Sequence, residues 1–79
     1  MSKNLSYIKN LMIKHIIKDF QLDDKIYKVV TVLNRISMAK NLLQSPDQYA
    51  ANREYLLRDR FDKMFDIARI YAEYNRRLH

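Results

Sequence analysis

The chain has 79 residues, no cysteine, no glycine and a single proline. This composition excludes a disulfide framework, a thiolate metal site and every glycine-dependent phosphate loop, and it favours an all-α fold in one domain over residues 1–79. The net charge of +6 is concentrated in residues 1–44, where eight Lys and Arg residues stand against three acids. This charge permits nucleic acid, an anionic lipid or an acidic protein surface as a partner without identifying one.

The first predicted element is a helix over residues 3–19. Apolar residues recur there at three- and four-residue spacing, which places them on one helical face. These residues are Leu5, Ile8, Met12, Ile16 and Phe20. The sequence leaves open whether the chain breaks after Phe20 or bends into the next helix.

The second predicted element is a helix over residues 24–44, with Asp23 or Asp24 as its N-cap. The same spacing gives it one apolar face, formed by Leu22, Ile26, Val29, Leu33, Ile36 and Leu43. Residues 29–32 are β-branched and locally favour a strand, but we expect the longer helical period to prevail.

The clearest boundary lies at Ser45-Pro46-Asp47-Gln48. Ser45 is a preferred N-cap, Pro46 suits the first helical position, and Gln48 completes a capping box. A third helix is therefore predicted over residues 46–77. Its main apolar face holds residues at alternating spacings of four and three, namely Leu57, Phe61, Met64, Ala68 and Tyr71.

A short turn joins the predicted helices 24–44 and 46–77, so we expect them to lie antiparallel. Their matched faces predict a coiled-coil-like helical hairpin with an additional N-terminal helix. A second apolar cluster lies beside the main face of helix 46–77, formed by Tyr49, Leu56, Ile67, Ile70 and Tyr74. Either the N-terminal helix covers this cluster within a three-helix bundle, or a partner protein covers it, and we predict these five residues as the partner-binding set.

No catalytic centre, cofactor site or metal site is predicted. His15 and His79 are the only histidines, and their separation does not match a metal-binding pair. No apolar run reaches the roughly 18 residues of a membrane span, and Lys9 and Lys14 interrupt any signal-peptide core. We therefore expect a non-catalytic cytoplasmic protein, which binds nucleic acid only non-specifically because it lacks a base-reading cluster.

The stretch from Leu43 to Asn52, with Leu56 after it, resembles the turn and second-helix start of the small co-chaperones of bacterial type III secretion systems. The shared pattern is close to L-Q-x-P-x-Q-Y-x-x-N-x-x-x-L. Isoleucine and tyrosine positions of the family fall near Ile67, Ile70, Tyr71 and Tyr74, so the likeness covers residues 43–74. The N-terminal half is more basic than the family pattern.

The resemblance implies a helical-hairpin subunit that forms a cytoplasmic heterodimer with a larger TPR-like chaperone. Together they would stabilise the needle subunit of the secretion system before export. Such a co-chaperone has no enzymatic activity and takes no cofactor. The alternative reading of the basic composition is a small nucleic-acid-binding or regulatory protein, including one that acts as a homodimer.

Overall fold

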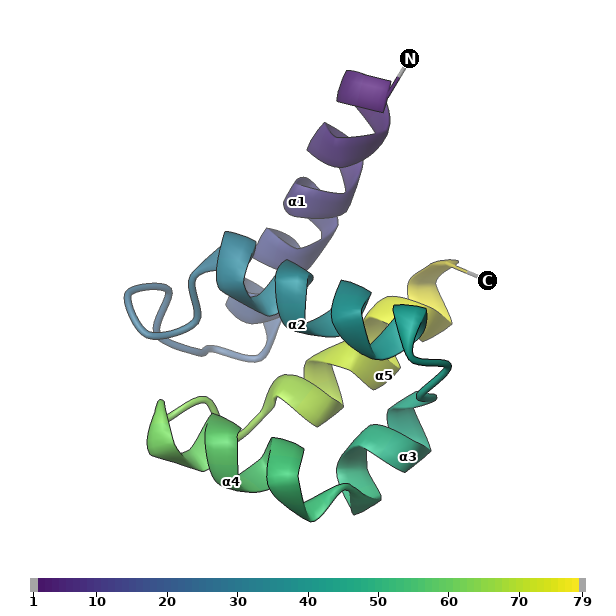
Figure 1. Cartoon of the computed structure of the whole chain (residues 1–79). Helices are drawn as coiled ribbons and strands as arrows, with labels where there is room; N and C mark the ends of the chain where they lie inside the picture. The colour runs from purple at the N-terminus through teal and green to yellow at the C-terminus, as the bar shows by residue number, and fades with distance from the viewer. Residues whose placement is uncertain (1, 79) are drawn as a thin grey trace.

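The computed structural model describes the backbone of residues 2–78 and the side chains of residues 7–78. Over this range it forms five helices: α1 (Ser2–Asp19), α2 (Val29–Asn41), α3 (Pro46–Ala51), α4 (Arg53–Phe61) and α5 (Ile67–Leu78) (Figure 1). No strand occurs among residues 2–78. The all-α prediction is confirmed, and the helix predicted over residues 3–19 corresponds to α1. The side chain of Leu5 lies outside the described residues.

The second predicted helix begins later than expected, at Val29. Asp23 instead closes a separate turn, in which its Oδ1 accepts the backbone N–H of Lys25 at 2.8 Å. Lys28 is then extended and stands at the N-cap position without a side-chain cap. Aspartate forms such local turns readily, and this preference replaces the first turn of the predicted helix. The prediction that Asp23 or Asp24 caps α2 is therefore wrong.

The third predicted helix, over residues 46–77, is divided into three helices. α3 begins with the predicted capping box, in which the Gln48 N–H donates to Ser45 Oγ at 3.1 Å and the Ser45 N–H donates to Gln48 Oε1 at 2.8 Å. α3 ends at Ala51. The next residue, Asn52, has an extended backbone and caps α4, with its Oδ1 accepting the N–H of Tyr55 at 3.2 Å. Asparagine is a preferred N-cap residue, so a local signal interrupts the long helix without glycine or proline.

Three helices end in a left-handed residue, although the chain has no glycine. Gln21, Leu43 and Lys63 have φ angles of 57°, 58° and 61°. Each belongs to a Schellman turn, in which the following N–H bonds back into the helix, as from Met64 to the Asp59 carbonyl at 2.7 Å. Residues with a Cβ are strained in this conformation. Tertiary packing therefore has to hold these turns, including the one at Lys63 that separates α4 from α5.

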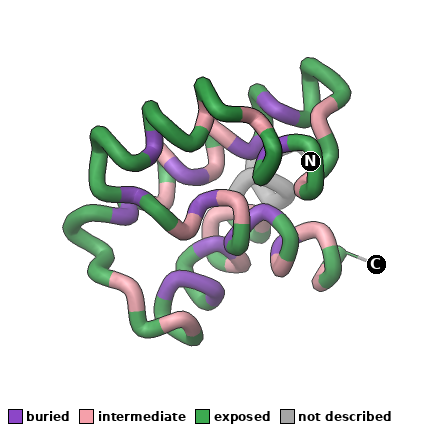
Figure 2. The backbone as a smooth tube through the Cα atoms, turned by 90° about the horizontal axis from the view of Figure 1, so that it is seen from below, coloured by how far each residue is buried: buried purple, intermediate pink, exposed green. Residues whose placement is uncertain are grey.

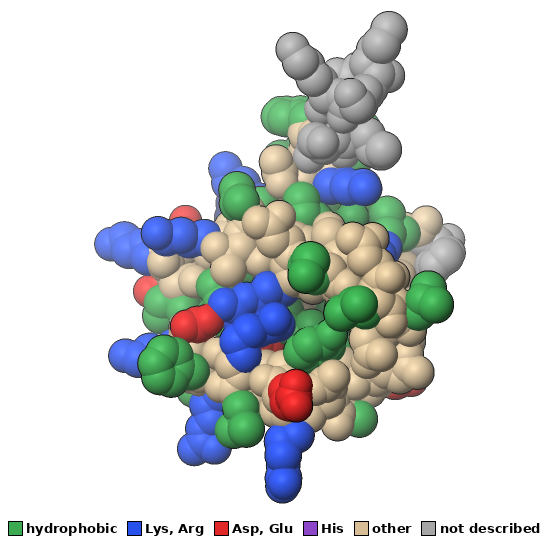
Figure 3. Space-filling model, in the orientation of Figure 1, with side chains coloured by type: hydrophobic (Ala, Val, Ile, Leu, Met, Phe, Trp, Pro, Cys, Tyr) green, Lys and Arg blue, Asp and Glu red, His purple; other side chains and the backbone are tan. Residues whose placement is uncertain are grey.

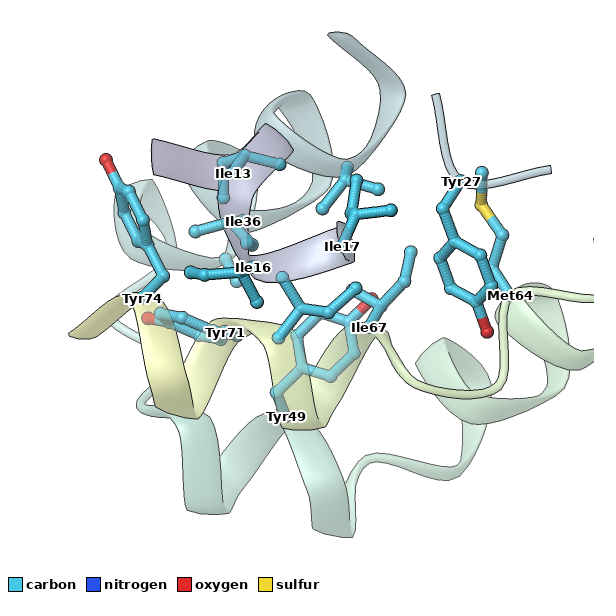
Figure 4. Packing of buried hydrophobic residues seen from close by; sticks show 13 residues of the cluster. Ile13, Ile16, Ile17, Tyr27, Ile36, Tyr49, Met64, Ile67, Tyr71 and Tyr74 are labelled. Atoms are coloured by element: carbon cyan, nitrogen blue, oxygen red, sulfur yellow. The ribbon is translucent and has the colours of Figure 1, made fainter. Parts of the chain in front are cut away.

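α5 lies at the centre of the fold, in contact with α1, α2 and α3 (Figure 1). Buried segments of the helices face one another across the interior (Figure 2). The core is made of Ile13, Ile16, Ile17, Tyr27, Val32, Ile36, Ala39, Tyr49, Met64, Ile67, Ile70, Tyr71 and Tyr74 (Figure 4). α1 packs on both α2 and α5, so the N-terminal helix covers apolar surface of the other helices.

Core tyrosines fix the connecting segments through their hydroxyl groups. The Tyr71 hydroxyl donates to the Gln44 carbonyl at 2.6 Å, before α3. The Asp66 N–H donates to the Tyr27 hydroxyl at 3.1 Å, before α5. Burial raises the pKa of both Tyr27 and Tyr71, so these hydroxyls stay protonated near neutral pH. These bonds position the N-terminal half of α5 relative to the loops.

Candidate interaction surface

Most of the predicted partner-binding residues lie in the chain's own core. Tyr49, Ile67, Ile70 and Tyr74 are buried, and Figure 4 shows members of this set packed against isoleucines of α1 and α2. Only Leu56 is exposed. The chain's own helices therefore cover four of these five residues, as the alternative of an intramolecular bundle predicts, and partner binding through this cluster stays an untested prediction.

The main apolar face predicted for helix 46–77 divides at the end of α4. Met64 and Tyr71 are buried, whereas Leu57 and Phe61 face solvent, and Phe61 has 88% of its surface exposed. The expectation that Leu57 and Phe61 pack inside a hairpin is wrong. The left-handed turn at Lys63 changes the direction of the chain, so a spacing that is continuous in sequence is not one face in space.

The side of α4 that packs against the rest of the protein carries a polar residue. Asp59 is its buried residue, with 2% of its surface exposed, while Leu57 and Phe61 project from the opposite side. A surface helix ordinarily buries its apolar stripe and exposes its charges. α4 therefore combines a buried charge with exposed large apolar residues, which are the two informative exceptions to ordinary burial.

A network of charges and hydrogen bonds holds Asp59. The Arg35 guanidinium on α2 donates to Asp59 Oδ1 at 2.8 Å and also binds Asp62. The Tyr49 hydroxyl on α3 donates to Asp59 Oδ2 at 2.5 Å and accepts a hydrogen bond from Arg58 at 2.8 Å. Within residues 7–78, every buried side-chain nitrogen or oxygen atom has a hydrogen-bond partner. Two neighbouring helices thus anchor α4 through one carboxylate.

The network fixes the protonation of its members. Burial and, after it, the hydrogen bond to Asp59 raise the pKa of Tyr49 well above that of a free tyrosine. Burial opposes the charge of Arg35, but the hydrogen bonds and charges of Asp62 and Asp59 outweigh it and raise the pKa of Arg35. A protonated tyrosine and a charged arginine are donors to a carboxylate, so the arrangement suits anchoring rather than proton transfer.

We call Leu57 and Phe61 the outer face of α4; the turn that follows adds the exposed Phe65. Figure 3 shows hydrophobic side chains on the molecular surface next to arginine and lysine side chains. Arg53 and Arg60 are exposed on the same helix. Aromatic residues and arginine are enriched at the centres of protein interfaces, so this composition is typical of a protein-binding surface.

A groove runs between α1 and the segment that leads into α2. α1 and α4 lie on opposite sides of α2 (Figure 1). The two adjoining parts of the groove share Lys14 and Val29 and have volumes of about 480 and 330 Å³. The apolar side chains that line it are Tyr7, Leu11, Ile17, Leu22, Val29 and Val30. Sequence reasoning missed this surface, although Tyr7 and Leu11 stand one helical turn apart outside the predicted face of α1.

The described residues also bear on metal binding and membrane insertion. Among them, no group of three or more His, Asp or Glu side chains could hold a metal ion. No helix within residues 2–78 is both long enough and apolar enough to cross a bilayer. His15 is exposed, and His79 lies outside the described residues.

No protein-family model, curated protein or solved structure matches the chain.

Proposed function

We propose that this chain is a non-catalytic protein-interaction module that binds a larger partner protein through the outer face of α4. One observation carries the proposal. α4 is fixed to α2 and α3 by its polar side, through Asp59, and this orientation turns Leu57 and Phe61 to solvent. A partner that covers these two residues would recover the apolar burial that the chain alone does not achieve.

The gain from covering the outer face of α4 is large enough for binding. Full burial of a Leu or Phe side chain contributes about 1.5–3 kcal/mol. Loss of an aromatic anchor from an interface commonly costs about 2 kcal/mol or more. Because the Asp59 network already fixes α4, binding a partner costs little conformational entropy for ordering this helix. Leu57 and Phe61 are therefore the expected anchors.

The specific form that we propose is a co-chaperone for the needle subunit of a type III secretion system. The support is the resemblance over residues 43–74, and three residues of its motif shape the region around the outer face. Gln48 completes the α3 cap, Asn52 caps α4 and Tyr49 binds Asp59. In this proposal the chain acts in the cytoplasm without a cofactor and pairs with a larger TPR-like chaperone that holds the needle subunit.

Co-purification from the native host tests the proposal, with the bound protein identified by mass spectrometry. We expect the double variant Leu57→Ser with Phe61→Ser to lose the partner while its circular dichroism stays unchanged. Met38→Ser is the matched control, because Met38 is an exposed apolar residue on α2. It should keep the partner.

The outcomes separate the general proposal from its specific form. A TPR-like chaperone lost only from the α4 variant supports both. A different protein lost in the same way supports the interaction module and rejects the co-chaperone. Retention of the partner by the α4 double variant at wild-type yield would reject the outer face of α4 as the binding surface.

A further inference from the structure

We propose that the groove between α1 and α2 is a second binding site, which takes an acidic amphipathic helix from a partner protein. Its lining residues belong to α1, to the segment that leads into α2 and to the start of α2, and α1 lies on the other side of α2 from α4 (Figure 1). The groove is therefore separate from the outer face of α4, and the inference stands whether or not α4 binds a partner.

The size and exposure of the groove suit a short helix. Tyr7 and Val30 line its shallower part with 67% and 64% of their surfaces exposed. The N-terminal turns of α1 extend beyond the other helices, so the described part of the chain leaves this end uncovered (Figure 1). From Tyr7 to Lys18 the groove follows α1 for about 16 Å, which matches about three helical turns.

The charge along the groove selects an acidic occupant. Lys14 and Lys18 stand on its α1 wall, and neither makes an ion pair with another described residue. The acid nearest to them on α1, Asp19, is instead paired with Arg77 at 2.8 Å. Acidic side chains beside an apolar stripe would pair with both lysines while the stripe covers the floor of the groove.

In the deeper part of the groove, the wall opposite α1 carries the opposite charge: Asp23 and Asp24 line the same cavity as Lys14 and Lys18. The Asp23 carboxylate already accepts the Lys25 N–H at 2.8 Å. The N-terminus of a helix is the positive end of its dipole. The bound helix is therefore expected to place its N-terminus near Asp23 and Asp24 and its acidic side chains along the α1 wall.

A second copy of this chain fits the groove less well than an acidic segment. The exposed side of α1 that carries Tyr7 and Leu11 also carries Lys14 and Lys18, so its insertion would bring lysines against lysines. The outer face of α4 is accompanied by Arg53 and Arg60. Like charges across an interface are unfavourable, which leaves a helix of another protein as the occupant.

The test uses a synthetic peptide of about 14 residues, built as a helix with a leucine stripe flanked by glutamates. A peptide of the same composition in scrambled order is the control. Binding to the full chain is measured by fluorescence anisotropy in about 150 mM salt, where distant charge attraction is largely screened. Amide chemical shifts should change along α1 and at the start of α2, and not in α4.

Two charge-reversal variants with the same change in net charge separate the groove from general basicity. Lys14→Glu with Lys18→Glu should weaken binding of the amphipathic peptide at least about tenfold. Arg60→Glu with Lys63→Glu, on the far side of α2, should change it less than about twofold. Val30→Asp should also weaken binding, because it charges the apolar floor of the groove.

Several results would overturn the proposal: equal binding of the scrambled peptide, equal loss from both charge-reversal variants, or no binding. A DNA duplex that binds more tightly than the peptide at the same salt, and is lost from Lys14→Glu with Lys18→Glu, would assign the groove to nucleic acid. A concentration-dependent dimer that Val30→Asp dissociates would assign it to a second copy. None of these results bears on α4, whose variants are assayed separately.

Discussion

α4 and α5 follow each other in the sequence, but they bury opposite kinds of side chain. α5 buries its apolar residues Ile67, Ile70, Tyr71 and Tyr74 in the core. α4 buries the carboxylate of Asp59 and exposes Leu57 and Phe61. Both helices come from a stretch whose apolar spacing predicts one continuous helix.

The difference shows that apolar spacing assigns a face only while the helix is continuous. The Schellman turn at Lys63 interrupts the helix. Beyond this turn α5 begins as a new helix, whose faces do not continue those of α4. What fixes α4 is a set of bonds to Arg35 on α2 and Tyr49 on α3. α5 is thus held by apolar burial and α4 by a buried charge. The stability of α5 should therefore depend on its apolar side chains, and that of α4 on the charged and hydrogen-bonding groups around Asp59.

The largest expected effect is on the anchor of α4. Asp59→Ala leaves the buried Tyr49 hydroxyl without its acceptor and removes one of the two carboxylates that bind Arg35, so it should lower the free energy of unfolding by about 3–5 kcal/mol. Asp59→Asn keeps a hydrogen-bond acceptor and should cost less. Urea unfolding measures both. Equal stability of Asp59→Ala and wild type would mean that the network does not hold α4.

The corresponding change in α5 removes apolar burial. Ile70 is fully buried, so Ile70→Ala should lower the free energy of unfolding by about 2–5 kcal/mol. The matched change in α4, Leu57→Ala, should cost less than about 0.5 kcal/mol because that side chain is exposed. Thermal unfolding followed by circular dichroism compares the two. If Leu57→Ala instead cost more than Ile70→Ala, Leu57 would have to lie in the core and Ile70 at the surface.

A smaller effect concerns the turn that separates the two helices. Lys63 is left-handed, and Lys63→Gly removes the steric strain of its Cβ, which should raise the free energy of unfolding by about 1 kcal/mol. Arg60→Gly, inside α4, should instead lower it by about 0.5–1 kcal/mol. A loss of stability in Lys63→Gly would contradict the left-handed turn.

The smallest effect is a pH dependence at the end of α5. Hydrogen bonds from Arg76 and Arg77 lower the pKa of Glu73 to about 2. Because this folded-state pKa lies below the ordinary value of 4.5, the stabilising contribution is present above pH 4.5 and disappears as the pH falls toward 2. The stability difference between wild type and Glu73→Gln should therefore shrink over that range. A difference that grows on acidification would contradict the assignment.

Local signals in the sequence predicted the features that depend on local structure. The Ser45 capping box was found because its residues lie within one helical turn, and α1 because its apolar period is uninterrupted. The inversion of α4 depends on the pairing of Arg35 with Asp59, which lie 24 residues apart, so no local spacing reports it. The left-handed turn at Lys63 lacks the glycine that usually marks such a position. Asn52, a typical N-cap, was the available sign that helix 46–77 is not continuous.

The most direct test of the inverted α4 is the stability of the isolated chain with its outer face made polar. Leu57→Ser combined with Phe61→Ser should leave the free energy of unfolding within about 0.5 kcal/mol of wild type, because neither side chain packs in the core. Guanidinium unfolding at equal protein concentrations measures the difference. A loss of more than about 3 kcal/mol would show that Leu57 and Phe61 are core residues and would contradict this account of α4.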